Sequence, residues 1–288
     1  MEGNTVAHDM NSKFAKKFLC SIDGSRYSQL AYKCTKSLMK KSDKITLFHV
    51  FSRNDKGKNN PSRLEEEYET ELIGTFHRSR YSILWHNRDY DERSVKDILE
   101  DISKGDYDKV DAPDFMVLGY SGWKFDSDGN REEATSAGST TDFCLRHIRN
   151  PIVIVKRDCE PGPNHFVMTV NGSNASKLGL DILYALVGPR DSLTVITISE
   201  HSRADAAIED YYAAELLENC PTTSTRFESI QRTGSDTIHD TLNDYLRNLE
   251  NGLDFLVIAP RSRVDNIFSS FTERVIQDVK ANIILCKV

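Results

Sequence analysis

The sequence lacks three features that would each point to a class of function. It has no excess of positive charge, because 37 lysines and arginines stand against 44 aspartates and glutamates, giving a formal net charge of -7. That balance, with no basic patch to offset it, argues against nucleic acid or an anionic membrane surface as a partner. No run of about 18 apolar residues is present to span a bilayer. The six cysteines form no C-x-x-C pair and no metal-binding spacing.

These absences predict a cytoplasmic protein whose cysteines are reduced and mostly buried. The polar stretch at residues 1–16 does not look like a secretory signal, and we expect it to be a loose arm. A chain of 288 residues is long for one small α/β unit and sufficient for two, each with its own core.

Short apolar runs alternate with segments of helical periodicity along the chain. In the first half, we predict strands at 17–22, 45–51, 81–85, 115–120 and 152–156, with helices between them. Ser25 is a suitable N-cap for the first helix, and Gly105 would end a later one. This order predicts a doubly wound α/β fold with a parallel sheet, because crossover connections are right-handed.

Three glycines lie at or after the end of the fourth predicted strand, namely Gly119, Gly122 and Gly138. Glycine at a strand end permits positive φ and lets a ligand approach bare backbone. Ser139 and Thr140 lie where a helix would begin, and its free N–H groups and dipole would favour phosphate oxygens. The alternative is that these glycines only shape turns, and spacing alone slightly favours it.

The second half of the chain repeats the first. Residues 17–51 align without gaps on residues 165–199, with identities that include Phe18 with Phe166, Gly24 with Gly172, Ser25 with Ser173 and Asp43 with Asp191. Asp114-Phe115 also matches Asp254-Phe255 near the end of each half. We therefore predict two domains, at 17–158 and 165–288, joined by a linker at 159–164 that is rich in proline and glycine.

These features together resemble the universal stress protein family. The first strand ends in Asp23-Gly24-Ser25, the second reads LFHV, and spaced glycines precede the run NPIVIVK. The resemblance implies two tandem domains of the Rossmann-like, adenine nucleotide alpha hydrolase-like type, each with a five-stranded parallel sheet. In nucleotide-binding members the loop reads G-x2-G-x9-G-(S/T) and holds the phosphates and ribose of ATP.

The first copy contains every defined residue of that pattern, as Gly119-x2-Gly122-x15-Gly138-Ser139, with a middle spacer six residues longer. The resemblance implies a site for ATP, with or without Mg²⁺, in this copy. Asp23 could instead serve only to cap the following helix. The implied site residues are Asp23 and Val50 at the adenosine, and Gly119, Gly122, Gly138, Ser139 and Thr140 at the phosphates and ribose.

The second copy departs from the pattern. Ala259 stands in place of the first glycine, Ser269 in place of the last, and Asn171 in place of the aspartate after the first strand. Pro260 removes an N–H group from the loop. We therefore expect the second domain to be a structural partner that binds no nucleotide.

The longer spacer, residues 123–137, carries four acidic and two basic side chains, an unfavourable sign beside a triphosphate unless a divalent cation intervenes. Residues 126–130 lack the ligand spacing of a calcium loop. We expect a solvated loop here and no metal site.

No catalytic residues are predicted. The chain has no G-x4-G-K-(S/T) motif, no kinase motifs and no histidine paired with a serine or cysteine motif, so slow ATP hydrolysis would be incidental. The favoured function is an ATP-binding stress-response or signalling protein. The alternative is a scaffold that binds no nucleotide and contacts an unknown protein partner through the acidic loop. A related nucleotide-binding enzyme is a more distant third, because the S-G-G-x-D-S signature is absent.

An apolar run ends each half, at 152–156 and 283–288. An exposed strand edge at either run would invite uncontrolled pairing. Members of the family that this chain resembles pair through their last strands. We therefore expect these two runs to lie together, so that one chain forms a pseudo-dimer. A homodimer is a further possibility.

Overall fold

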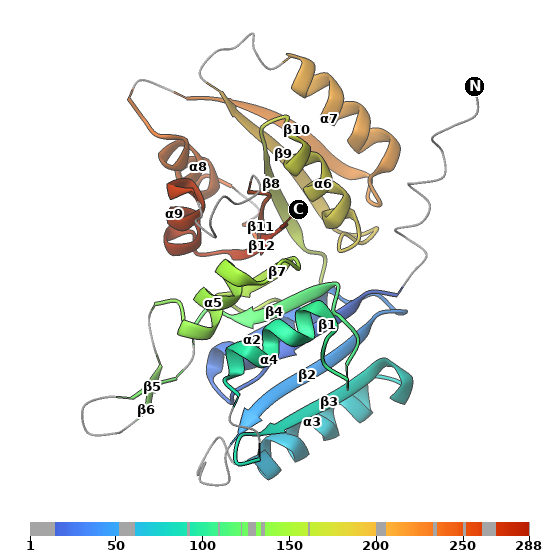
Figure 1. Cartoon of the computed structure of the whole chain (residues 1–288). Helices are drawn as coiled ribbons and strands as arrows, with labels where there is room; N and C mark the ends of the chain where they lie inside the picture. Colours follow the sequence, from blue (N-terminus) through green and yellow to red (C-terminus); the bar gives the residue numbers. More distant parts are fainter. Residues whose placement is uncertain are drawn as a thin grey trace. The chain divides into compact units, whose positions relative to one another are not determined.

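The computed structural model describes residues 15–51, 61–90, 93–108, 110–121, 123–125, 131–133, 136–160, 162–199, 206–232, 235–249, 252–260 and 269–287. The predicted N-terminal arm lies outside these residues except for its last two. The chain divides into two compact units, Ala15–Cys159 and Glu160–Val288, which are called the first and second unit and described separately (Figure 1).

The first unit holds one parallel sheet in the order β3-β2-β1-β4-β7. In chain order its elements are β1 (Lys17–Ser21), α2 (Arg26–Leu38), β2 (Lys44–Phe51), α3 (Pro61–Thr75), the 3-10 turn η2 (Arg78–Arg80), β3 (Tyr81–Asn87), α4 (Val95–Lys104), β4 (Phe115–Gly119), β5 (Trp123–Phe125), β6 (Arg131–Glu133), α5 (Ser139–His147) and β7 (Ile152–Val155).

The second unit repeats this arrangement in the order β10-β9-β8-β11-β12, again all parallel. Its elements are β8 (His165–Val170), α6 (Asn174–Tyr184), β9 (Ser192–Ser199), α7 (Ala206–Asn219), β10 (Ser224–Gln231), α8 (Ile238–Arg247), β11 (Phe255–Ile258), α9 (Ser270–Asp278) and β12 (Asn282–Leu285). The predicted doubly wound α/β fold class is therefore confirmed.

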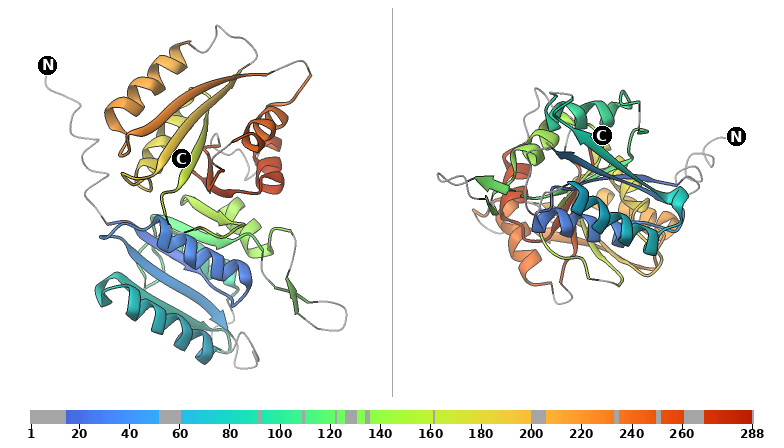
Figure 2. Two further views of the ribbon diagram at one scale, coloured as in Figure 1. Left: turned by 180° about the vertical axis from the view of Figure 1, so that it is seen from behind. Right: turned by 90° about the horizontal axis from the view of Figure 1, so that it is seen from below.

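Helices cover both faces of the first sheet. Tyr32 of α2 packs edge to face on Tyr68 of α3, with ring centroids 5.1 Å apart, and these two helices lie in front in the reversed view of Figure 2. On the other face, Lys96 of α4 lies 5.8 Å from the ring of Phe143 in α5. The central strands are consequently buried on both sides, which explains why they read as continuous apolar runs rather than alternating ones.

One aspartate that is identical in the two halves makes hydrogen bonds at the amino-terminal edge of each sheet. Asp43 accepts hydrogen bonds from the backbone N–H groups of Lys16 (2.9 Å) and Lys40 (2.7 Å). Asp191 accepts the equivalent bonds from Asn164 (2.8 Å) and Gly188 (2.7 Å). Both carboxylates are buried. The two hydrogen-bond donors at each carboxylate offset the free-energy cost of removing it from water.

Part of the longer spacer forms regular structure. Residues Trp123–Phe125 and Arg131–Glu133 pair as an antiparallel two-stranded sheet separate from the main one. The sequence predicted a solvated loop here and did not predict this pairing, while residues 126–130 lie outside the described ranges. Among the described residues, none of the helices combines the length and apolar character that a membrane crossing needs.

Candidate nucleotide site

The first unit places its candidate site where the winding of the sheet reverses. From β1 the chain leaves through α2 toward β2, whereas from β4 it leaves through α5 toward β7 on the other side. β1 and β4 are neighbours, with Cys20 opposite Val117. In open α/β sheets this switch point leaves a crevice at the carboxyl ends of the strands, and ligands bind there.

Asp23 lies in the tight turn after β1. Its Oδ1 accepts a hydrogen bond from the N–H of Ser25 at 2.9 Å, and Gly24 between them has φ of 75°. Ser25 is the N-cap of α2, because its hydroxyl accepts from the N–H of Ser28. Ser25 is thus the helix cap that the sequence predicts. Asp23 holds the turn and does not cap the helix itself, and its half-buried carboxylate stays at the strand end.

Val50 lies on the neighbouring strand beside this turn. The N–H of Ile22 donates to the carbonyl of Phe48 at 2.9 Å, and His49 Nδ1 lies 2.7 Å from the carbonyl oxygen of Ile22. These contacts bring the end of β2 against the residue that precedes Asp23. Val50 is half-buried, so part of its side chain stays accessible at the edge of the sheet.

Gly119 is required by packing. A Cβ placed there would lie 2.8 Å from the backbone carbonyl carbon of Tyr27 and 2.9 Å from its Cβ. The first turn of α2 therefore fits against the end of β4 only because this position has no side chain. Neither Gly119 nor Gly138 has positive φ. The positive φ that glycine permits at a strand end is therefore not the reason for glycine at these two positions.

Gly138 begins α5 without a side-chain cap. It is the N-cap residue, with φ of -67° and ψ of 151°, and it offers no side-chain acceptor to the first-turn N–H groups. Its own N–H donates to the carbonyl of Tyr120 at 3.0 Å, and Thr141 Oγ1 donates to the carbonyl of Gly119 at 2.8 Å. These two bonds fasten the start of α5 to the end of β4.

Ser139 is exposed and Thr140 half-buried in the first turn of α5, where the sequence places them. The described backbone thus joins the end of β4 to the start of α5, and it places Val50 beside the turn that holds Asp23. Gly122 lies outside the described residues.

In the second unit, the corresponding helix α9 begins with a side-chain cap. Ser269, the N-cap of α9, accepts a hydrogen bond from the N–H of Thr272 at 3.3 Å. Ala259 replaces Gly119, and its Cβ would meet a Cβ at Gly179 at 2.6 Å, so the close approach has moved to the first helix of this unit. Residues 261–268, which include the two arginines of this loop, lie outside the described ranges.

Cysteine chemistry does not contribute to the site. All six cysteines are free and five are buried, which confirms the expectation from their sequence context. Burial raises the pKa of Cys20 to about 12 and that of Cys286 to about 12, so both thiols stay protonated at neutral pH. No group of three or more metal-ligating side chains occurs among the described residues.

A hollow in the first unit, away from the candidate nucleotide site, was not anticipated from the sequence. It has a volume of about 420 Å³ and borders the end of β3 and the residues that flank α4. His86 is buried beside it and lies 3.2 Å from the hydroxyl of Tyr107, over which Arg93 stacks at 5.7 Å. His86 thus has a structural partner, in line with the expectation that the histidines are structural or on the surface. Its position beside a hollow depends on the residues that follow α4, so the sequence around His86 could not predict it.

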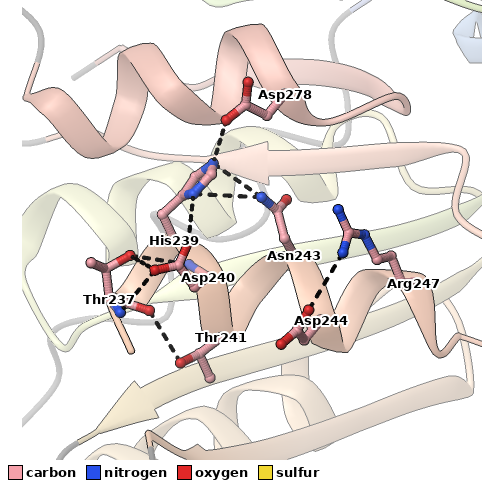
Figure 3. A network of polar contacts seen from close by, with 8 residues as sticks. All are labelled: Thr237, His239, Asp240, Thr241, Asn243, Asp244, Arg247 and Asp278. Carbon is pink, nitrogen blue, oxygen red and sulfur yellow. Dashed lines mark hydrogen bonds and ion pairs between the residues drawn. The ribbon is translucent and has the colours of Figure 1, made fainter. Parts of the chain in front are cut away.

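The second unit also holds a polar network between α8 and α9 (Figure 3). His239 is buried, with Nε2 3.2 Å from Asp278 of α9 and Nδ1 3.6 Å from Asp240. Asp240 in turn accepts from the hydroxyl and the N–H of Thr237, and these bonds lower the pKa of its carboxyl. The network joins two helices and caps one of them, so we assign it a structural role.

Comparison with known proteins supports the fold. No family model and no curated protein matches the chain. A universal stress protein from Archaeoglobus fulgidus matches with a TM-score of 0.60 at 15% identity, over 94% of this chain and 98% of that one. A putative universal stress protein from Pseudomonas aeruginosa matches with a TM-score of 0.61 at 12% identity, over 96% and 94%.

A third solved structure, the cytoplasmic domain of a prokaryotic cation chloride cotransporter, matches with a TM-score of 0.55 at 12% identity, over 94% of this chain and 95% of that one. Identities this low carry information about the fold alone. Over nearly its whole length, the chain has a fold like that of universal stress proteins.

Proposed function

We propose that the protein is an adenine nucleotide-binding stress-response or signalling protein, with ATP bound in the first unit only. The phosphates would lie at the start of α5, and the adenosine between the Asp23 turn and Val50. Because proteins of different roles share this fold, the proposal depends on the site rather than on the fold.

The observation that carries the proposal is the difference between the two helix N-termini. α5 starts at Gly138, which has no side chain to satisfy its first-turn N–H groups, whereas α9 starts at Ser269, which satisfies one of its own. An uncapped helix start at a switch point presents N–H groups and a positive dipole end, the features that favour phosphate. At the same place in the second unit, one of these N–H groups already has an acceptor in the protein itself.

The other site residues are arranged to support a nucleoside. The half-buried Asp23 keeps a carboxylate at the end of β1, while the second unit has the neutral Asn171 there. Mg²⁺ would offset the acidic residues of the longer spacer beside a triphosphate. We propose binding, with any hydrolysis slow and incidental, and assign no residue to catalysis.

The test is ATP binding by titration calorimetry, with and without Mg²⁺, on the full chain and on two variants of Gly138. Gly138 has the extended backbone that N-cap residues adopt, so its φ and ψ suit Gly138→Asn and Gly138→Asp, and both residues are good helix caps. The two side chains have nearly the same shape, but Asp is negatively charged and accepts only, whereas Asn is neutral and can also donate. We expect Asn to weaken ATP binding by competing for one N–H group, and Asp to weaken it at least tenfold more by repelling the phosphates.

The matched control is Ser269→Asp, which adds the same charge at the capped helix of the second unit and should leave ATP binding unchanged. Thermal unfolding of every variant checks the fold, which a better cap should preserve or stabilise. Absence of any binding heat from the unmodified chain at millimolar ATP would contradict the proposal and favour the protein scaffold. Equal binding by the Asn and Asp variants would place the phosphates elsewhere.

A further inference from the structure

A second hollow in the first unit, with a volume of about 320 Å³, lies on the sheet near the amino-terminal ends of β1, β2 and β3. Lys17 lies opposite Lys44 in the strand register. Thr46, two residues after Lys44, lies opposite Ser82. Residues two apart on a strand point to the same face, so these four side chains share one face of the sheet. The segment between α4 and β4 borders the hollow, where it contributes Asp111.

The hollow is positively charged although the chain as a whole is acidic, with a formal net charge of -7. Its lining contains three cationic side chains and one carboxylate, namely Lys17, Lys44 and Arg80 against Asp111. The cations come from three separate segments, so no run of basic residues marks them in the sequence. Only the pairing of the strands brings this charge together.

The protein itself uses these cations only in part. Lys17 Nζ lies 3.6 Å from Asp111 Oδ2, and the Asp111 side chain is 82% exposed. An ion pair this open to water contributes little free energy, so an incoming anion can displace it. Lys44 is exposed, and within the described part of the chain its ammonium group has no ion pair. Arg80 donates to two backbone carbonyl oxygens, at 3.0 and 2.8 Å, which hold its charge in place.

The second unit fills the equivalent place with its own hydrogen bonds. His165 and Ser192 stand where the first unit has its two lysines. His165 Nε2 lies 3.3 Å from Thr194 Oγ1, and Arg226 Nε donates to the same hydroxyl at 3.0 Å. The equivalent threonine of the first unit lies 2.8 Å from Ser82 Oγ. A pair of hydroxyls shares one hydrogen between them, so the other hydrogen can be donated to a ligand.

We propose that this hollow binds a phosphate group, carried by a small molecule or present as the free ion. A phosphate offers three or more acceptor oxygens, which match two ammonium groups and a hydroxyl better than the two oxygens of a carboxylate do. The volume is at the lower end of small-molecule sites and leaves room for a phosphomonoester. On binding, Lys17 exchanges Asp111 for the phosphate. The inference goes beyond the proposed function, because the candidate nucleotide site lies at the carboxyl-terminal ends of the strands.

The test is a titration of the full chain with inorganic phosphate, glycerol 3-phosphate and acetate, followed by the NMR shifts of backbone amides. Low ionic strength keeps the exposed charges unscreened. We expect both phosphates to cause saturable shifts at the amino-terminal ends of β1, β2 and β3. Tighter binding of glycerol 3-phosphate would identify a phosphomonoester as the ligand, and equal binding would identify the free ion.

Three variants separate a defined site from general attraction. Lys44→Gln should weaken phosphate binding about 5-fold, and Asp111→Asn should strengthen it about 2-fold because Lys17 loses its competing partner. The matched control is Lys41→Gln, which removes the same charge from an exposed lysine outside the hollow and should leave the affinity unchanged.

Equal weakening by Lys44→Gln and Lys41→Gln would overturn the inference, as would acetate binding as tightly as phosphate. Shifts confined to the start of α5 would also overturn it, while they would support the proposed nucleotide site. Conversely, shifts at β1, β2 and β3 from a chain that binds no ATP would support this site and contradict the proposed function.

Discussion

The two units share a backbone plan and differ at one edge of the sheet. At the amino-terminal edge, Asp43 and Asp191 make the same pair of backbone hydrogen bonds. At the carboxyl-terminal edge, Gly138 leaves a helix uncapped where Ser269 caps its counterpart. The residues that the two copies share therefore support the scaffold, and the copies differ at the place where we propose a nucleotide site in the first unit alone.

The same division applies to the aromatic core. Phe18 stacks on Phe115 with ring centroids 5.2 Å apart, and Phe166 stacks on Phe255 at 5.1 Å. All four side chains are buried, so the pairing of the first and fourth strands is stabilised alike in both units. The internal repeat lets each unit serve as the control for the other.

The largest effect should come from removing the shared carboxylates. Asp43→Ala and Asp191→Ala each leave two N–H groups without their carboxylate acceptor; one of the four is buried and three are part-buried, so the cost is on the order of 2–3 kcal/mol for each variant. Hydrogen exchange, followed separately in each unit, should show the loss in the mutated unit and similar losses for the two variants. Glu65→Ala, on the exposed face of α3, is the control. A loss in one unit only would break the equivalence of the two scaffolds.

A smaller effect should follow from adding a side chain where α6 packs against the end of β11 in the second unit. Gly179→Ala puts a Cβ 2.6 Å from the Cβ of Ala259, which should cost about 1–3 kcal/mol in denaturant unfolding. Adding Ala259→Gly should restore part of that loss, because it removes the opposing atom. In the first unit, Gly119→Ala meets the backbone of Tyr27 and has no such rescue. Equal losses in the single and double variants of the second unit would contradict this packing assignment.

The smallest effect concerns the helix caps that both units share. Asp97 accepts from Ser94, and Asp240 accepts from Thr237, in the same capping box. The hydroxyl and N–H of Thr237 lower the pKa of Asp240, so its contribution to stability is present above about pH 4 and is lost as pH falls further. We expect Asp240→Asn to flatten the acid dependence of the unfolding midpoint between about pH 5 and 2. An unchanged slope would show that this cap does not titrate with folding.

The sequence predicted the strands, their order and the repeat, because these depend on apolar runs and turn residues that are local in the chain. It also predicted the cap at Ser25, since a hydroxyl before a helical pattern has few other roles there. The ribbon of β5 and β6 was missed because strands of three residues leave no periodicity to detect. Pairing of β7 with β12, the nucleotide and the domain limits remain predictions.

Sequence alone determined the fold class and which copy keeps the glycine pattern, because alternation of strand and helix and the identity of a residue are properties of the chain itself. Only the tertiary structure decided what those residues do. A side chain at Gly119 would clash with α2, and Gly138 leaves the start of α5 without a side-chain cap. Both depend on which segments meet in space, which spacing along the chain does not encode.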